Sequence, residues 1–176
     1  MQPIEERGYI IPAFNIGAVD YVDCARTLAK TLLQQHPTAR ICLLTNDDTA
    51  KDDTLFAYTH IVKDINWDNP YANDWIVFHQ TPFRQTIKLE ADMIIPYNID
   101  YWWDILALKD VVVCNTIRNF KGDISDVKFY RKFIYDNELP DVYNAITYFK
   151  KSDGAKLFYS LVREFFENWD QVRKEL

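Results

Sequence analysis

Short apolar runs separated by polar turns recur along this chain, and their lengths are those of β-strands. The runs at residues 8–15 and 40–46 each contain consecutive apolar residues, which is typical of strands buried on both faces of a sheet. Residues 86–95 instead alternate apolar and polar side chains, which is the period of a strand. Further strands are predicted at residues 59–65, 111–117 and 142–149.

Two long helices are predicted from apolar residues that recur at helical spacing. The clearer one covers residues 18–35, and the second follows Ser152 and Asp153 with an apolar stripe of Leu157, Leu161, Phe165 and Trp169. Shorter helices are predicted at 75–84 (broken at Pro82), after Asp100 and at 127–137, with polar loops at 66–73 and 118–126. The order strand, helix, strand near the N-terminus favours a parallel sheet. We therefore expect one α/β domain over residues 1–176, with a mostly parallel central sheet flanked by helices.

Composition narrows the class of protein without naming a function. With 176 residues, 48% hydrophobic and 15% aromatic, the chain is long enough for one core and is not disordered. Its apolar runs are too short to cross a bilayer and its N-terminus lacks a signal-peptide pattern, so no membrane partner is expected. Cys24, Cys42 and Cys114 are interpreted as buried thiols, which favours a reducing, cytoplasmic location. A net charge of −6 argues against a broad nucleic-acid surface.

The alternating segment carries the strongest candidates for chemistry. In a regular strand, Lys88, Glu90 and Asp92 lie on one face. Two carboxylates there repel each other and lose hydration, a cost that a divalent cation removes by sharing their oxygens. The alternative is that these acids are solubilising charges, or ion-pair partners of Lys88 and Arg84. The spacing by itself does not decide between the two.

The segment Glu90-Ala91-Asp92 resembles the metal-binding Asp-x-Asp motif of GT-A-fold glycosyltransferases, with Glu in place of the more usual first Asp. The likeness continues through Ile99-Asp100, the helix YWWDIL and the strand VVVCNTI, an order similar to that of the glycogenin-like branch. It covers nearly all of the chain, which also looks similar to glycosyltransferase-like proteins of tailed bacteriophages. The resemblance implies a GT-A (Rossmann-like) fold and a Mn²⁺ or Mg²⁺ ion held by Glu90 and Asp92.

The same resemblance assigns the nucleotide site to the first strand and helix. In the family a short polar turn holds the uracil ring and a tyrosine stacks on it. The matching residues here are Ala13, Phe14, Asn15 and Tyr21. Stacking a base on an aromatic face contributes about 1–3 kcal/mol. The alternative is structural, with Asn15 capping the helix and Tyr21 packing at its start.

Asn144, in the segment VYNAITYF, matches a family asparagine near the transferred sugar, although Ile146 stands where the family has Gly. Asn144 equally suits a role in satisfying backbone groups at the start of a strand. Arg84 and Lys88 lie upstream of the acids, where a cation would offset the charge of a departing diphosphate. Arg84 is the stronger catalytic candidate, because Lys88 can instead neutralise Glu90.

Other polar residues are less informative. Thr45-Asn46-Asp47 ends the second predicted strand, at the carboxyl edge where ligands of open α/β sheets bind. Its alternative is a turn or helix cap. His36, His60 and His79 show no paired spacing, and we assign them to ordinary structure.

The resemblance as a whole implies transfer of a sugar from a UDP-like nucleotide sugar to a hydroxyl acceptor, with retention of configuration. The metal would act as a Lewis acid on the diphosphate. The phage proteins suggest hydroxymethylated DNA bases as an acceptor, so nucleic acid enters only as acceptor, and the oligomeric state stays open. One alternative is a GT-A-like nucleotide-binding protein with little or no turnover. Another is nucleotidyl transfer, which ranks last because the first strand has only isolated glycines.

The C-terminal end of the sequence affects the rate of sugar transfer that we expect. In the family the chain continues beyond the helix that matches residues 157–174, and that segment supplies acceptor-site acids and a further metal ligand, often His. This sequence ends at Leu176 and has no His after His79. We therefore expect a fragment, a minimal version or a partner-dependent or inactive relative. Because closure of a site suppresses hydrolysis of a reactive donor, we expect nucleotide binding with slow transfer and substantial donor hydrolysis.

Overall fold

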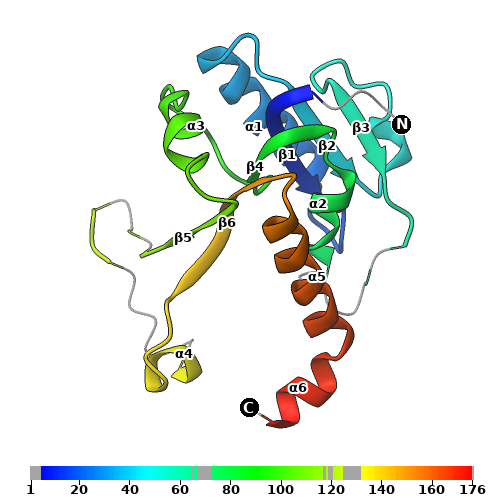
Figure 1. Cartoon of the computed structure of the whole chain (residues 1–176). Helices are drawn as coiled ribbons and strands as arrows, with labels where there is room; N and C mark the ends of the chain where they lie inside the picture. Colours follow the sequence, from blue (N-terminus) through cyan, green and yellow to red (C-terminus); the bar gives the residue numbers. More distant parts are fainter. Residues whose placement is uncertain are drawn as a thin grey trace.

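A six-stranded sheet forms the centre of the computed structural model, which describes residues 5–64, 66, 73–116, 118, 121–124 and 132–175 (Figure 1). The strands are β1 Glu5–Ala13, β2 Ile41–Thr45, β3 Tyr58–Ile61, β4 Phe83–Leu89, β5 Val111–Asn115 and β6 Val142–Lys150. They lie in the order β3-β2-β1-β4-β6-β5. The pairs among β1 to β4 are parallel, and β6 runs antiparallel to both β4 and β5. The mostly parallel sheet predicted from the sequence is confirmed.

Each face of the sheet packs against its own apolar cluster. The helices are α1 Tyr21–Gln35, α2 Ile76–Gln80, α3 Tyr101–Leu106, α4 Lys132–Asp136, α5 Asp153–Glu167 and α6 Trp169–Glu175, with a 3₁₀ turn η1 at Asp48–Ala50. Helices α1 and α3 contribute to one cluster, and α2 and α5 to the other. Ile10 and Ile11, neighbours on β1, join opposite clusters, as the alternation of a strand requires. Burial on both faces explains the unbroken apolar runs of β1 and β2.

Strand β4 differs from its prediction at both ends. It begins at Phe83 and stops at Leu89, so the acids lie in the turn that follows it and not on one face of a strand. The Glu90 amide makes a last bond to Ala145 O at 3.0 Å, and the Met93 amide then turns back to Glu90 O at 3.3 Å. Further on, the Ile95 amide donates to Thr31 Oγ1 of α1 at 3.1 Å. Ala91 and Ile95 are therefore buried in a loop that packs along α1, whereas Ile94 is 61% exposed.

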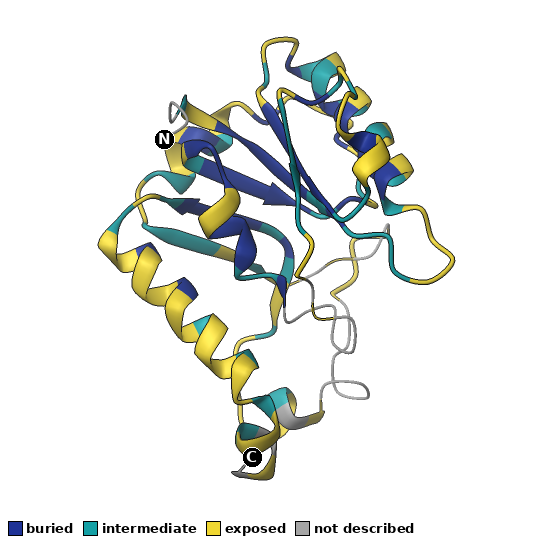
Figure 2. Cartoon of the chain, turned by 90° about the vertical axis from the view of Figure 1, so that its right-hand side faces the viewer, coloured by how far each residue is buried: buried dark blue, intermediate teal, exposed yellow. Residues whose placement is uncertain are grey.

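The C-terminal helix projects from the sheet by its second half (Figure 2). Ser152 caps it as predicted, because its hydroxyl accepts from the Ala155 amide at 3.2 Å. The side of the helix that faces the sheet is buried at Ala155 and Tyr159. The predicted apolar stripe lies elsewhere: Leu157 is 62% exposed and Leu161 is 55% exposed. A turn at Asn168 then separates α5 from α6, where the sequence predicts one continuous helix.

The other predicted elements are present where the structure describes the chain. Helix α1 starts at Tyr21, later than predicted, because Asp20 caps it by accepting from the Asp23 amide at 3.0 Å. Pro82 separates α2 from β4. Of the predicted helix at 127–137, only α4 lies in the described residues. The predicted loop at 66–73 falls largely outside them, whereas residues 118 and 121–124 of the predicted loop at 118–126 are described.

The surroundings of the cysteine thiols and of His36 suit structural roles. Cys42 is fully buried, and burial raises the pKa of its thiol to about 12, whereas Cys24 and Cys114 are only half-buried. Buried His36 accepts from the Ile99 amide at 3.1 Å, and its Nδ1 lies 3.2 Å from Asp100 Oδ1. It thereby ties the end of α1 to the start of α3. Within the described part of the chain, no helix has both the length and the apolar character needed to span a membrane.

Candidate functional site

The carboxyl ends of β1 and β2 are joined by a network of short polar contacts. The Asn15 amide donates to Asn46 Oδ1 at 2.8 Å, and Asn46 Nδ2 donates back to Asn15 O at 3.2 Å. The Asn15 side chain donates to Asp47 Oδ2 at 3.3 Å and accepts from the Val22 amide, in the first turn of α1, at 3.2 Å. The capping contact offered as the alternative for Asn15 is thus present. The network fixes the polar turn that the sequence assigns to the nucleotide.

The other residues that the resemblance assigns to the nucleotide base lie in different surroundings from one another. Ala13 is buried at the end of β1 and presents no side chain to a ligand. Half-buried Phe14 packs against the cluster that contains α2, whereas half-buried Tyr21 packs against the cluster that contains α1. Only Tyr21 begins a helix at the carboxyl edge of the parallel strands. It is therefore the better placed of the two rings for stacking.

Lys88 is the most unusual residue of the site, because its side chain is 4% exposed and carries an ammonium group. The Nζ atom donates to the backbone oxygen of Asn144 at 2.6 Å and lies 3.6 Å from Glu90 Oε1. A buried ammonium is tolerated only when it is paired and hydrogen-bonded. The pairing with Glu90 that the sequence offered as an alternative for Lys88 is thus present.

Asn144 is held by contacts from two directions. Its Nδ2 donates to the carboxylate of Asp74, and its Oδ1 accepts from Thr147 Oγ1 at 2.9 Å. Burial raises the pKa of the Asp74 carboxyl, Lys88 opposes the rise and Glu90 adds to it. Asp74, Lys88, Glu90 and Asn144 therefore form one cluster between the start of β6 and the end of β4. Sequence reasoning missed Asp74, because no spacing links it to residues that follow 14 and 70 positions later.

Asp92 is exposed and, in the part of the chain that the structure describes, has no hydrogen bond or ion pair. It shares the turn after β4 with Glu90, whose side chain is 37% exposed. Two exposed carboxylates are a donor set that suits a hard divalent cation. Among the described residues there is no group of three or more His, Cys, Asp and Glu side chains that could hold a metal. Glu90 and Asp92 would therefore be an incomplete protein shell.

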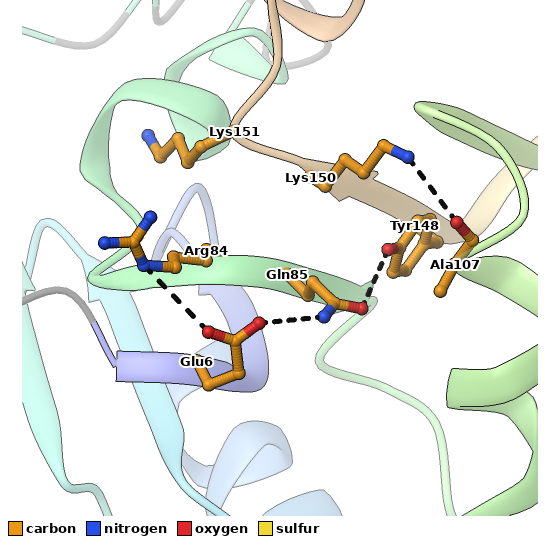
Figure 3. Close-up of a pocket in the computed structure, with 7 residues that line it drawn as sticks. All are labelled: Glu6, Arg84, Gln85, Ala107, Tyr148, Lys150 and Lys151. Carbon is orange, nitrogen blue, oxygen red and sulfur yellow. Dashed lines mark hydrogen bonds and ion pairs between the residues drawn. The ribbon is translucent and has the colours of Figure 1, made fainter.

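Arg84 lies at the opposite end of β4 from this cluster. It is the second residue of β4, and at about 3.3 Å per residue the rest of the strand spans on the order of 16 Å. Its exposed Nε is 3.9 Å from Glu6 Oε2, beside a hollow of about 300 Å³ at the amino end of the strand. Figure 3 shows Lys150 directed toward Ala107 and away from Arg84. The structure thus does not bring Arg84 together with the acids, although the sequence places it directly upstream.

Comparison with known proteins supports the fold. No protein-family model and no curated protein sequence matches the chain. Solved structures do match: the glycosyltransferase GlyE of Streptococcus pneumoniae TIGR4 has a TM-score of 0.60 at 13% identity, over 97% of this chain and 39% of GlyE. Mouse xyloside xylosyltransferase 1, in its apo form, has a TM-score of 0.57 at 10% identity, over 94% of this chain and 76% of its own.

A third similar structure is that of a synthetase. It is CMP:2-keto-3-deoxy-manno-octonic acid synthetase in complex with CTP, with a TM-score of 0.50 at 13% identity, over 95% of this chain and 78% of the synthetase. Such low identities establish a shared fold and nothing finer. The chain therefore has a GT-A-like α/β fold. The substrate of this chain, and the branch of GT-A-fold enzymes that it most resembles, have to be argued from the site.

Proposed function

We propose that this chain is the nucleotide-sugar-binding domain of a glycosyltransferase, which moves a sugar from a UDP-like donor to a hydroxyl acceptor. The observation that carries the proposal is the buried ammonium of Lys88 beside Glu90, with the unpaired carboxylate of Asp92 in the same turn. This group stands at the carboxyl end of β4, the edge at which open α/β sheets bind their ligands. The likeness in fold to two glycosyltransferases supports the choice of chemistry.

In this proposal Glu90 and Asp92 hold a Mn²⁺ or Mg²⁺ ion, which when bound acts as a Lewis acid on the diphosphate. Lys88 keeps Glu90 in place and adds positive charge near the departing diphosphate. The turn of Asn15 and the ring of Tyr21 receive the base. Asn144 lies beside Lys88, which is consistent with the position near the sugar that the resemblance implies.

The acceptor is the least constrained part of the proposal. A hydroxyl is required, and the hydroxymethyl group of a modified phage DNA base is one that fits. A chain with a net charge of −6 does not attract duplex DNA broadly, so such a base would have to enter the site as an acceptor only. A free sugar or a protein hydroxyl would meet the same chemical requirement.

Thermal unfolding with UDP and Mn²⁺ tests the proposal. We expect UDP with Mn²⁺ to raise the melting temperature, and Asp92→Ala to abolish the rise. Asp170→Ala, which removes an exposed carboxylate on α6, is the matched control and should keep it. If no nucleotide or nucleotide sugar shifts the melting temperature in the presence of a metal, the proposal is wrong.

A product assay separates sugar transfer from the nucleotidyl transfer suggested by the third similar structure. A glycosyltransferase releases UDP from a UDP-sugar, whereas a nucleotidyltransferase releases pyrophosphate from a nucleoside triphosphate. We expect UDP release only. Pyrophosphate release from CTP or UTP with an added sugar would replace our proposal by nucleotidyl transfer. Binding of UDP without release of UDP from any UDP-sugar would favour a nucleotide-binding protein without turnover.

A further inference from the structure

We propose that Asp74 is a positioning residue of this site: its carboxylate fixes the Asn144 carboxamide, beside the backbone oxygen that holds Lys88 next to Glu90. The inference rests on the function proposed above and extends it to a residue that no motif singles out. Its basis is the continuous series of contacts from Asp74 through Asn144 to Lys88 and Glu90.

The chemistry of the contact decides which way the Asn144 side chain faces. A carboxylate only accepts hydrogen bonds, whereas a carboxamide has one accepting oxygen and one donating nitrogen. Asp74 therefore requires Nδ2 on its side, which leaves Oδ1 to accept from Thr147 Oγ1 at 2.9 Å. The hydroxyl of Thr147 both donates and accepts, so it would tolerate either orientation of the carboxamide. Asp74 alone makes the orientation unique.

A fixed carboxamide is useful only if it has bonding capacity left. Nδ2 carries two hydrogens and Oδ1 has two lone pairs, and Asp74 and Thr147 each use one of them. One N–H and one lone pair remain for a ligand in a defined orientation. That pattern of one donor beside one acceptor is complementary to a sugar hydroxyl, which is itself a donor and an acceptor. The remaining donor and acceptor of Asn144 thus suit the sugar that the proposed function places near this residue.

The titratable groups that face Asp74 come from a strand, a turn and a helix. Lys88 and Glu90 face it from β4 and the turn that follows, and Tyr159 faces it from α5. Burial, and then the charge of Asp74, raise the pKa of the Tyr159 phenol. Among the described residues, the groups that stabilise this carboxylate near another carboxylate and a buried phenol are Lys88 and Asn144. Such an arrangement is unfavourable for stability by itself, which is the pattern expected of a residue kept for its role in a site.

Kinetic constants of four variants test the inference, with UDP-sugar turnover as the assay. Asp74→Ala should lower kcat about 100-fold with little change in KM for the donor, since a misplacement of about 1 Å has an effect of that order. Asp74→Asn and Asp74→Glu each keep an oxygen that can accept from Asn144 Nδ2, so both should be intermediate. Asp53→Ala removes another partly buried carboxylate, the partner of Arg26 at 2.7 Å, and should leave kcat unchanged. Equal effects of Asp74→Ala and Asp53→Ala, or a loss in Asp74→Asn as large as that in Asp74→Ala, would overturn the positioning role.

A measurement without substrate separates this inference from the proposed function. The side-chain amide protons of Asn144, identified by their loss in Asn144→Asp, should exchange slowly with solvent in the wild type and quickly in Asp74→Ala. Fast exchange in the wild type would overturn the contact whatever the chain catalyses. Slow exchange without turnover of any nucleotide sugar would instead reject the proposed function, and with it the catalytic purpose of the contact.

Discussion

The ammonium nitrogen of Lys88 lies 3.6 Å from Glu90 Oε1, at the point where β4 leaves the sheet. One partner is buried and the other is partly open to solvent, so the pair connects the core of the sheet with the turn that carries Asp92. A charge in this position holds Glu90 and also adds positive potential at the edge where an anionic nucleotide would bind.

Replacing Lys88 by Met should therefore affect both stability and binding. We expect the free energy of unfolding to fall by about 1–3 kcal/mol, because Asn144 O loses its partner, and UDP–Mn²⁺ to bind at least tenfold more weakly. Arg84→Met removes a cation from the other end of the same strand and should change neither quantity appreciably. Denaturant unfolding and calorimetric titration measure the two effects. Weaker UDP binding in Arg84→Met than in Lys88→Met would mean that Arg84 takes part in nucleotide binding after all.

Mn²⁺ should bind weakly alone and much more tightly with UDP. With Glu90 and Asp92 as its only protein ligands, the ion would have to complete its shell with diphosphate oxygens and water. Titration calorimetry with Mn²⁺ alone, and then with Mn²⁺ in the presence of UDP, checks this expectation. Tight binding of Mn²⁺ without nucleotide would mean that the protein supplies ligands beyond these two.

The contacts of Glu5 at the start of β1 with Arg40, just before β2, and Tyr58, at the start of β3, should depend on pH. Hydrogen bonds from Arg40, and then from Tyr58, hold the pKa of Glu5 below its usual value of 4.5. An acid with a lowered pKa in the folded state adds stability above its ordinary pKa, and this stability is lost as the pH falls through the lowered value. Glu5→Gln should therefore flatten the fall in melting temperature below pH 4.5, and Glu164→Gln, at an exposed position on α5, should not. A melting temperature that falls below pH 4.5 as steeply in Glu5→Gln as in the wild type would contradict the prediction.

The two sides of α5 should differ strongly in their contribution to stability. Tyr159 is buried among Phe78 and Phe149, with ring centroids 5.1 and 5.0 Å away, so Tyr159→Ala should destabilise the fold by about 3–5 kcal/mol. Leu161 is 55% exposed, and Leu161→Ala should change the free energy of unfolding by no more than about 0.5 kcal/mol. Denaturant unfolding of dilute protein compares the two. A large loss in Leu161→Ala would show that another surface covers this side of the helix.

Much of the fold could be predicted from the sequence because its causes are local. Short apolar runs such as ICLLT are typical of strands covered on both sides, and the spacing of Leu28 and Leu32 is typical of a helix face. Part of the site could also be predicted from the sequence. Lys88 and Glu90 are two positions apart, so any extended chain brings them near each other. The polar turn after β1 followed from the same local reasoning.

The tertiary structure decided the rest, because those relationships join residues far apart in the chain. Period two predicted a strand up to residue 95, but only the contact of Ile95 with Thr31 of α1 shows that the chain leaves the sheet at Glu90. The partnership of Asp74 with Asn144 spans 70 positions and depends on β6 running antiparallel beside β4. Periodicity likewise marked the stripe of Leu161 as apolar without indicating that it faces away from the sheet. A sequence pattern fixes which residues share a face, whereas what that face meets depends on the packing of distant elements.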